Sequence, residues 1–333
     1  MTVGRLSTVG MLLALLACAP KPVAPPMPGP VGVVGELVTE GPLKQRISTA
    51  AADLVVYYGA EHKGSMETCG CPKSPRGSFA RFAAYVEASR AAAPDVPSIQ
   101  VNAGYWLQDA MGFDGQLRSD LALQNAWMVR GSRTLGWDAL NVSTNDLAGL
   151  ATLPKDDGAP LPLVSANASG PGINRWVVIN RGGLRIGITG ITGVGATLTP
   201  IDGYTVTDPA SSGAVIDALA AEADVVVLLA EGATDAAREL AQHHPAIDLV
   251  IDAATHHEYA DPALLRHTAW TTANYQTMRI GEVRMRLADG VVTGALARQI
   301  DLDPEIPDEP AMLAVQRQAR AELDRAQQAL YGP

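Results

Sequence analysis

The sequence predicts an α/β domain with mixed sheets, and three observations support this. Short apolar runs alternate with helical patterns along most of the chain. Two pairs of expected strands, within residues 176–188 and 280–297, are joined directly by turns that contain glycine, as antiparallel hairpins are. The 333 residues are 47% hydrophobic and 18% charged, which is typical of a globular protein. Helices between strands together with hairpins favour mixed sheets.

The individual elements follow from the apolar periodicity. The expected strands cover residues 53–58, 98–102, 138–142, 161–165, 175–180, 184–190, 224–229, 247–252, 268–273 and 280–287. The expected helices cover residues 77–92, 116–135, 209–222 and 232–243. A further helix is expected over 310–331, and we expect its apolar face to dock on the domain. That face consists of Met312, Val315, Ala319, Leu323, Ala326 and Leu330.

The first 17 residues predict an export signal. Arg5 precedes an apolar segment that is too short to span a bilayer stably. The segment ends in Leu15-Leu16-Ala17-Cys18, which resembles the bacterial lipobox, so we expect Cys18 to be the lipid attachment site. This predicts a membrane-anchored lipoprotein of the bacterial cell envelope that faces the periplasm. Ala19, by resemblance to enterobacterial sorting, favours the outer membrane. A plain signal peptide that contains a cysteine is the alternative.

We divide the chain into four parts on this basis. Residues 1–17 form the lipoprotein signal peptide, 18–45 a proline-rich tether, 46–300 the main domain and 301–333 a C-terminal docking helix. Six prolines in residues 19–30 favour an extended polyproline II conformation. At about 3.1 Å per residue, such a segment holds a domain roughly 37 Å from a membrane.

The charge balance argues against nucleic acid as a partner. The formal net charge is −10, whereas binding to phosphate backbones needs clustered Lys and Arg. The acidity is typical of a soluble surface.

Cys69 and Cys71 are the remaining thiols if Cys18 carries lipid. An exported protein meets an oxidising compartment, so the pair predicts a disulfide. A Cys-x-Cys bridge closes a very small ring, which makes it strained and labile. Two alternatives remain. His62 with both cysteines could bind one soft ion such as Cu(I) or Zn(II), or the thiols could stay free.

Seven stretches carry a resemblance to a known family. They are GSFARFAAYVE (77–87), VNAGYWLQ (101–108), GWDALNVSTNDLAGL (136–150), PLVSAN (162–167), RGGLRIGITGIT (181–192), DVVVLLAEGA (224–233) and IDLVIDAATH (247–256). In this order they resemble the metallophosphoesterase domain of bacterial 5′-nucleotidases, within the calcineurin-like superfamily. The likeness runs from about residue 53 to 290. It implies a four-layer α/β/β/α sandwich of two mixed sheets, with its chemistry at the carboxyl ends of strands.

The resemblance also implies a two-metal centre, whose cations activate water and clamp phosphate oxygens. Its ligand positions fall on other residue types in this chain. In the D-x-H-G motif, the Asp falls on Glu61 and the His on Lys63. The bridging Asp of the next motif falls on Tyr105. The Asn and the catalytic His of the G-N-H-E motif fall on Thr144 and Asn145.

The last two motifs depart in the same way. The His of L-x-H-x-G falls on Ala230, and the G-H-T-H motif falls on 253–256, where Ala254 replaces the first His and only His256 is kept. Alanine cannot bind a metal ion, and Lys63 would repel a dication by several kcal/mol. The sequence therefore predicts a degenerate metal centre.

We expect a non-catalytic binding or scaffold module that uses the inherited cleft, with no catalytic residue and no bound metal. Lys63 could hold an anionic small molecule there, and an envelope protein is the other candidate partner. The cleft is expected to contain Glu61, His62, Lys63, Tyr105, Thr144, Asn145, Glu231 and His256. Glu67 and Asp146 are expected to be surface carboxylates.

Two alternative functions stay open. The first is a phosphoester hydrolase with a rebuilt site, in which a single metal ion is held by Glu61, His62, Glu231 and His256. The second is a thiol-redox or soft-metal-binding lipoprotein that uses Cys69 and Cys71.

Overall fold

The computed structural model describes residues 32–153, 158–197, 199–256 and 259–332. The predicted signal peptide, Cys18 and the proline-rich run lie outside these residues. The described part contains no helix that combines the length and the hydropathy needed to cross a bilayer.

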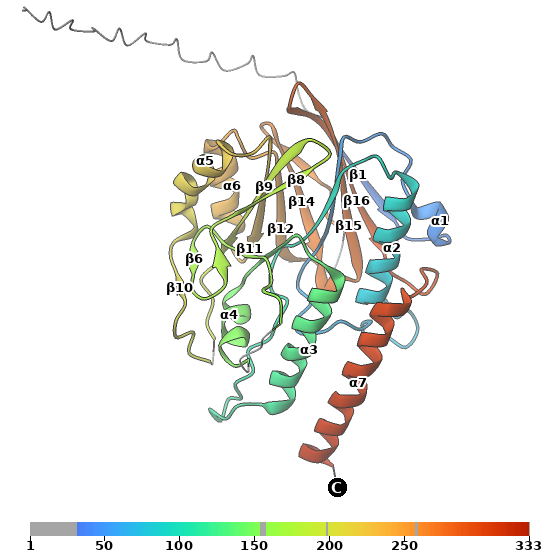
Figure 1. Ribbon diagram of the computed structural model, residues 1–333, viewed down its shortest axis with the longest axis vertical. Coiled ribbons are helices and arrows are strands. Elements are labelled where there is room, and N and C mark those ends of the chain that lie inside the picture. Colours follow the sequence, from blue (N-terminus) through green and yellow to red (C-terminus); the bar gives the residue numbers. More distant parts are fainter. Residues whose placement is uncertain (1–31, 154–157, 198, 257–258, 333) are drawn as a thin grey trace, which may run out of the picture.

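Two mixed sheets pack face to face at the centre of the molecule (Figure 1). The larger sheet consists, in spatial order, of β1 (Gly32–Val38), β16 (Val291–Asp301), β15 (Arg279–Ala288), β2 (Leu54–Gly59), β3 (Ser98–Asn102), β4 (Ala139–Asn141), β5 (Leu163–Val164) and β7 (Ile173–Asn174). The smaller sheet consists of β13 (Ala263–Leu265), β14 (Thr268–Asn274), β12 (Leu249–His256), β11 (Val225–Glu231), β9 (Leu184–Thr192) and β8 (Val177–Arg181). A separate ribbon pairs β10 (Thr205–Val206) with β6 (Ala168–Ser169).

Strand direction follows the sequence pattern. Strands β2 to β5 are parallel, as are β9, β11, β12 and β14. The two predicted hairpins are confirmed as the antiparallel pairs β8–β9 and β15–β16. The apolar core lies between the sheets, where residues such as Val56 and Val101 meet Ile188 and Val227. Because the buried strands of a parallel sheet have no solvated face, they read as continuous apolar runs.

Helices cover both outer faces, which completes the predicted four-layer α/β/β/α arrangement. The larger sheet is covered by α2 (Phe79–Ala92), α3 (Ser119–Leu135) and α7 (Pro310–Tyr331). The smaller sheet is covered by α5 (Gly213–Ala220) and α6 (Thr234–His243), whose apolar side chains pack on β11 and β12. The predicted helix over 209–222 is split, because residues Pro209–Ser212 form a 3₁₀ turn before α5.

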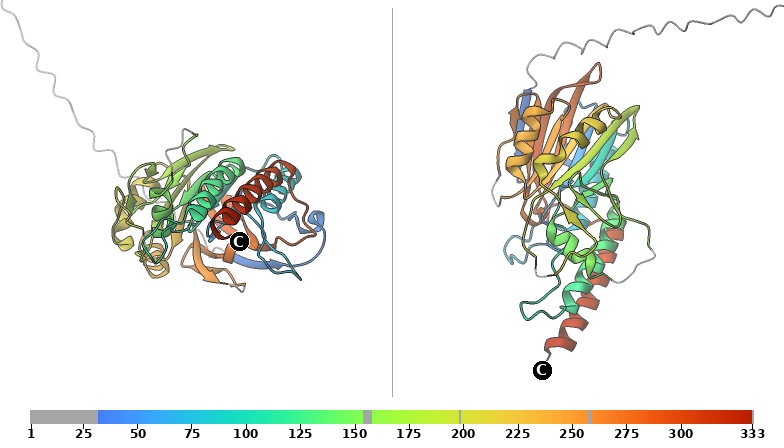
Figure 2. Two further views of the ribbon diagram at one scale, coloured as in Figure 1. Left: turned by 90° about the horizontal axis from the view of Figure 1, so that it is seen from below. Right: turned by 90° about the vertical axis from the view of Figure 1, so that its left-hand side faces the viewer.

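The C-terminal helix α7 docks as expected over its first half. Figure 2 shows it beside α3, and it also contacts α2. Met312 and Ala319 are buried in the core that these helices share. Leu330, near the C-terminal end of the helix, is 49% exposed.

The predicted tether extends too far into the domain. Its predicted end is residue 45, but residues 32–38 form the edge strand β1, which pairs in parallel with β16. The short helix α1 (Leu43–Arg46) follows. Strand β1 contains the β-branched valines that strands favour. It was not predicted, because the prolines just before it indicated a tether.

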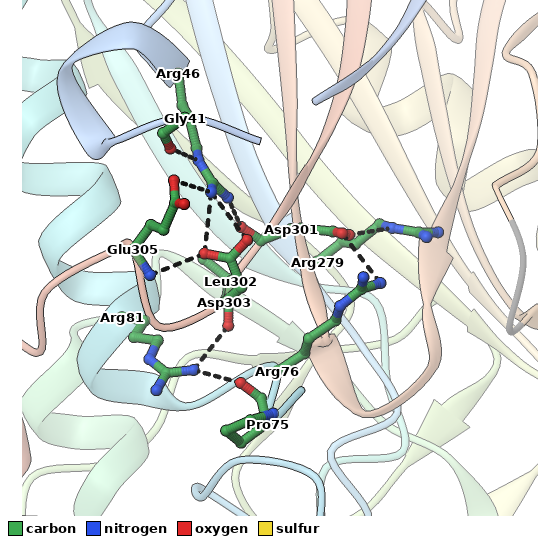
Figure 3. Close-up of polar contacts among 10 residues, drawn as sticks. All are labelled: Gly41, Arg46, Pro75, Arg76, Arg81, Arg279, Asp301, Leu302, Asp303 and Glu305. Atoms are coloured by element: carbon green, nitrogen blue, oxygen red, sulfur yellow. Dashed lines mark hydrogen bonds and ion pairs between the residues drawn. The ribbon is translucent and has the colours of Figure 1, made fainter. Parts of the chain in front are cut away.

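A buried ionic cluster fastens the N-terminal segment to the end of β16 (Figure 3). The fully buried Arg46 guanidinium donates to the Asp301 carbonyl at 2.6 Å and pairs with the Asp303 carboxylate at 2.9 Å. The buried Asp301 carboxylate pairs in turn with Arg279 at 2.6 Å and with Arg76 at 3.0 Å. Since Arg76 belongs to the loop before α2, the cluster also fixes that loop.

Candidate functional site

The carboxyl ends of β2, β3, β4, β9 and β11 meet at one end of the interface between the sheets. The Asn141 side-chain amide connects the sheets there, because it donates to the Ala103, Ile191 and Leu229 carbonyls at 3.0, 3.0 and 3.4 Å. A Cβ atom on Gly104 would lie 2.7 Å from Glu231, so this position needs glycine. The loops after β2 and β3 therefore face the end of β11.

Backbone hydrogen bonds hold these two loops in an uncommon conformation. Glu61, Lys63 and Tyr105 all have positive φ angles of 54°, 50° and 56°. The Glu61 and Lys63 amides donate to the Gly104 and Tyr105 carbonyls at 2.9 and 3.1 Å. Left-handed residues other than glycine cost roughly 1 kcal/mol or more each and gather at binding sites. The loops at these expected ligand positions thus have an energetically costly backbone conformation, although their residues are not the ligand types that the resemblance implies.

Lys63 lies among groups that attract its positive charge. Its ammonium nitrogen lies 3.3 Å from a Glu61 carboxylate oxygen, and the Glu61 side chain is only 4% exposed. The same nitrogen lies 4.9 Å from the ring centre of Tyr105 and 4.4 Å from that of Tyr275. Both distances suit cation–π attraction. The sequence analysis did not single out Tyr275, because only the tertiary fold brings it to this site.

Glu231 is the second carboxylate of the cleft, at the end of β11. Its pKa is raised to about 8, mainly by burial and then by the nearby Asp146 and Glu61 carboxylates, whereas Lys63 lowers it. At neutral pH the Glu231 side chain is therefore mostly protonated.

Asp146 is buried, and its prediction as a surface carboxylate is wrong. Its carboxylate accepts hydrogen bonds from the amides of Tyr105 at 2.8 Å, Leu107 at 2.6 Å and Ser143 at 2.7 Å. Burial raises its pKa to about 6 although these hydrogen bonds lower it. It forms a capping box with Ser143 at the start of α4 (Thr144–Ala151) and ties this helix to the loop after β3.

Thr144 and Asn145 form the first turn of α4. Thr144 is buried, and a Cβ atom on Gly195 would lie 2.6 Å from its hydroxyl, so the loop after β9 covers it closely. Asn145 is partly buried. The structure therefore places the Thr144 position beneath a loop, whereas the prediction placed it on the cleft surface.

His62 does not line the cleft, which corrects its assignment there. Its ring packs edge-on against Phe79, with ring centres 4.8 Å apart, and lies 6.1 Å from the Trp137 ring. These aromatic residues belong to the core beneath α2 and α3. Burial lowers the pKa of His62 to about 3, so the ring is neutral at pH 7. Both predicted metal sets that include His62 therefore lose this member.

His256 and the cysteines complete the predicted set. His256 is the last residue of β12, with its backbone in register with Asn274, and its side chain lies outside the described part. Ala230 is fully buried.

Cys69 and Cys71 are free thiols in the structure, so the predicted bridge between them is not formed there. Its formation on oxidation stays a prediction.

The described residues do not fit the two-metal centre that the resemblance implies. Among them, no three His, Cys, Asp or Glu side chains are grouped so that they could hold a metal ion. Lys63 places an ammonium group beside the carboxylate that would serve as a ligand. We therefore derive no hydrolytic step through a metal ion.

Comparison with known structures identifies the fold. The sulfate thiohydrolase SoxB of Thermus thermophilus, solved with glycerol, matches with a TM-score of 0.65 and 14% identity over 84% of this chain and 62% of that one. A 5′-nucleotidase precursor, also from Thermus thermophilus, matches with a TM-score of 0.64 and 17% identity over 82% and 59%. The NAD nucleotidase of Haemophilus influenzae matches with a TM-score of 0.61 and 13% identity over 82% and 60%.

These matches show that the chain has the calcineurin-like metallophosphoesterase fold of the bacterial 5′-nucleotidases. The chain spans about three fifths of the length of the structures it matches. No family model matches the sequence, and no curated protein sequence is significantly similar to it.

Proposed function

We propose that this chain is a lipid-anchored protein of the bacterial envelope in which the metallophosphoesterase fold serves as a non-catalytic binding or scaffold module. The observation that carries the proposal is the position of Lys63, whose ammonium group lies 3.3 Å from Glu61 between the Tyr105 and Tyr275 rings. A cation built into the chain takes the place that a metal ion would need. The lipid anchor is supported by the sequence around Cys18.

Electrostatics support this interpretation. A dication about 4 Å from an ammonium group is repelled by several kcal/mol even at an effective dielectric of about 20. Lys63 also offsets the cost of burying an ionised Glu61 carboxylate. The Lys63 ammonium group thus neutralises the Glu61 carboxylate, and a metal ion could bind this carboxylate only by displacing Lys63.

The charges of Lys63 and Glu61 also affect which kind of partner the cleft can bind. The anionic small molecule expected from Lys63 would meet the Glu61 carboxylate as well, because Glu61 already pairs with the Lys63 ammonium group. We therefore favour an envelope protein that presents a cationic or neutral polar group to the cleft. The Tyr105 and Tyr275 rings offer faces against which such a group can pack.

Metal analysis and phosphatase assays test the proposal. Protein purified without chelator should contain less than about 0.1 equivalent of Mn, Zn or Fe by inductively coupled plasma mass spectrometry. It should hydrolyse an aryl phosphate and nucleoside monophosphates no faster than a Glu61→Gln, Glu231→Gln double variant. Two equivalents of metal with turnover that the double variant lacks would overturn the proposal.

The alternative of a hydrolase with a rebuilt single-metal site gains no specific support. It required His62 beside Glu61 and Glu231, but the His62 ring packs against Phe79 in the helix-side core. The thiol-based alternative involves a different part of the molecule, the loop that carries Cys69 and Cys71.

A further inference from the structure

We propose that the loop carrying Cys69 and Cys71 is a thiol–disulfide exchange site, separate from the cleft, that transfers a disulfide to a pair of cysteines in an exported polypeptide. Cys71 is the exposed sulfur that the partner attacks, and Cys69 is the half-buried sulfur that leaves. The proposal rests on the envelope location that is part of the proposed function but not on the cleft, so the cleft function and the exchange site can each fail alone.

Backbone amides donate hydrogen bonds to both sulfurs. The Arg76 amide donates to the Cys69 sulfur at 3.2 Å. The Cys71 sulfur accepts from the Ser74 and Lys73 amides, and these hydrogen bonds lower the pKa of the Cys71 thiol, with the Arg76 charge contributing further. A sulfur that is stabilised as a thiolate is a better leaving group in disulfide exchange.

The loop is fixed at its base, which keeps these donors in place. Thr68 and Gly77 form an isolated antiparallel bridge, and the Cys69 amide donates to the Arg76 carbonyl at 2.8 Å. The Arg76 guanidinium pairs with the buried Asp301 in the cluster of Figure 3. Arg81 donates to the Pro75 carbonyl at 2.8 Å in the same cluster. The amides are therefore positioned before any reaction.

The exchange balances without an external electron carrier. A thiolate of the partner attacks the Cys71 sulfur, the bond between Cys69 and Cys71 breaks, and its electron pair leaves on Cys69 near the Arg76 amide. The second thiolate of the partner then attacks the partner sulfur of the mixed disulfide. Cys71 leaves as a thiolate that accepts hydrogen bonds from the Lys73 and Ser74 amides. The partner dithiol becomes a disulfide, and the loop becomes a dithiol. A second disulfide-carrying protein of the envelope reoxidises the loop by the reverse exchange.

Ring size sets the direction of transfer. A bridge between residues two apart is strained, and strained disulfides are readily reduced. Stabilisation of the Cys71 thiolate favours the reduced form as well. The oxidised loop is thus a disulfide donor.

A groove of about 390 Å³ beside the loop supports a polypeptide as the partner. Thr68 and Ser78 line it from the two ends of the loop, and Arg317 and Arg320 line it from α7. It gives an extended peptide room to lie next to the thiols, whereas a small thiol needs no such surface.

A redox titration tests the pair directly. The full chain with Cys18→Ser, which leaves only the two loop thiols, is equilibrated in glutathione buffers, trapped with an alkylating agent and weighed by mass spectrometry. We expect a reversible exchange between a doubly alkylated dithiol and an unalkylated disulfide that is two mass units lighter than the unmodified reduced protein, with a midpoint more oxidising than that of thioredoxin in the same buffers. Failure to form the bridge in fully oxidised glutathione would overturn the proposal.

Single variants assign the two sulfurs. With a peptide disulfide, Cys69→Ser should accumulate a mixed disulfide on Cys71, and Cys71→Ser should react at least about tenfold more slowly. Equal rates would refute the assignment. Both variants should unfold at the same temperature as the Cys18→Ser protein, which separates loss of chemistry from loss of fold.

A further variant tests the substrate class. Arg317→Glu should slow oxidation of a dithiol peptide about threefold or more and leave exchange with glutathione unchanged. An equal rate with the peptide would refute the groove as its binding surface and with it a polypeptide as the preferred partner.

Discussion

The Lys63 ammonium lies 3.3 Å from the Glu61 carboxylate, and the two residues are held by left-handed backbone conformations on either side of His62. The contact places a positive charge beside a carboxylate that is almost fully buried. The Glu61-His62-Lys63 segment thus forms an internal ion pair at the end of β2.

A double-mutant cycle measures this ion pair. Lys63→Met should destabilise the protein by about 2 kcal/mol, because it removes the ammonium group from beside the buried Glu61 charge. Adding Glu61→Gln should restore part of that loss. Urea denaturation of the four proteins gives the coupling free energy. Lys44→Met, at an exposed position, is the control, and additive effects at 61 and 63 would contradict the pairing.

Much of the fold was predictable because its signals are local. Apolar runs and glycine turns predicted the buried strands and both hairpins. Strand β1 and helix α4 are among the elements that were missed, and for different reasons. Strand β1 is defined by pairing with β16, near the other end of the chain, and local sequence does not specify that partner. Helix α4 has only eight residues, and its signal was the capping box between Ser143 and Asp146.

The site was less predictable than the fold. The resemblance placed Glu61, Lys63 and Tyr105 together, but it could not show where His62 points. Positive φ angles on both sides of His62 break the alternation of side chains that a strand would have, and its ring turns into the helix-side core. Tyr275 joins the site from a distant segment with no motif of its own.

Glu231 should make the protein less stable at alkaline pH. Its pKa is raised from 4.5 to about 8, so the protonated form is favoured in the folded state. The resulting stabilisation is complete below pH 4.5 and is lost as the pH rises through 8. Glu231→Gln, which stays neutral, should therefore be more stable than the wild type at about pH 9 by up to a few kcal/mol.

Urea denaturation at about pH 5 and about pH 9 checks this expectation. Asp248 also has a raised pKa, but it is present in both proteins and cancels in the difference. Asp146 interacts with Glu231, so its titration is part of the measured difference. Glu239→Gln changes an exposed carboxylate and serves as the control. A constant difference between Glu231→Gln and wild type across this pH range would show that Glu231 does not titrate as described.

His62 should remain neutral in mildly acidic solution. Burial lowers its pKa from 6.5 to about 3, so its stabilising neutral state is complete above pH 6.5 and is lost only as the pH falls toward 3. Nitrogen-15 NMR of the ring should show no protonation between about pH 8 and about pH 4. A histidine-containing peptide in the same buffers provides the reference. A midpoint near 6.5 would place the ring in solvent, outside the Phe79 and Trp137 cluster.

Helix α7 should stabilise the domain mainly through its first half. Met312 is buried, so Met312→Ala should cost about 2 to 4 kcal/mol through lost apolar contact and the cavity left behind. Leu330 is 49% exposed, so Leu330→Ala should cost less than about 0.5 kcal/mol. Equilibrium denaturation of the two variants tests the contrast. Equal losses would mean that α7 is anchored along its whole length.

Cys18 is the position at which the proposed membrane anchor can be tested. The lipobox-like segment Leu15-Leu16-Ala17-Cys18 predicts that cells fed a labelled fatty acid attach it to this protein, and that Cys18→Ser abolishes both the label and the membrane association. A single acyl chain binds a membrane only weakly, so the firm attachment of a lipoprotein needs several chains at the same cysteine. Fractionation of wild-type and Cys18→Ser cells on a density gradient should find the wild type in the outer membrane and the variant in the soluble fraction. Cys71→Ser, which leaves the segment intact, is the control, and a wild-type protein released by salt alone would rule out the anchor.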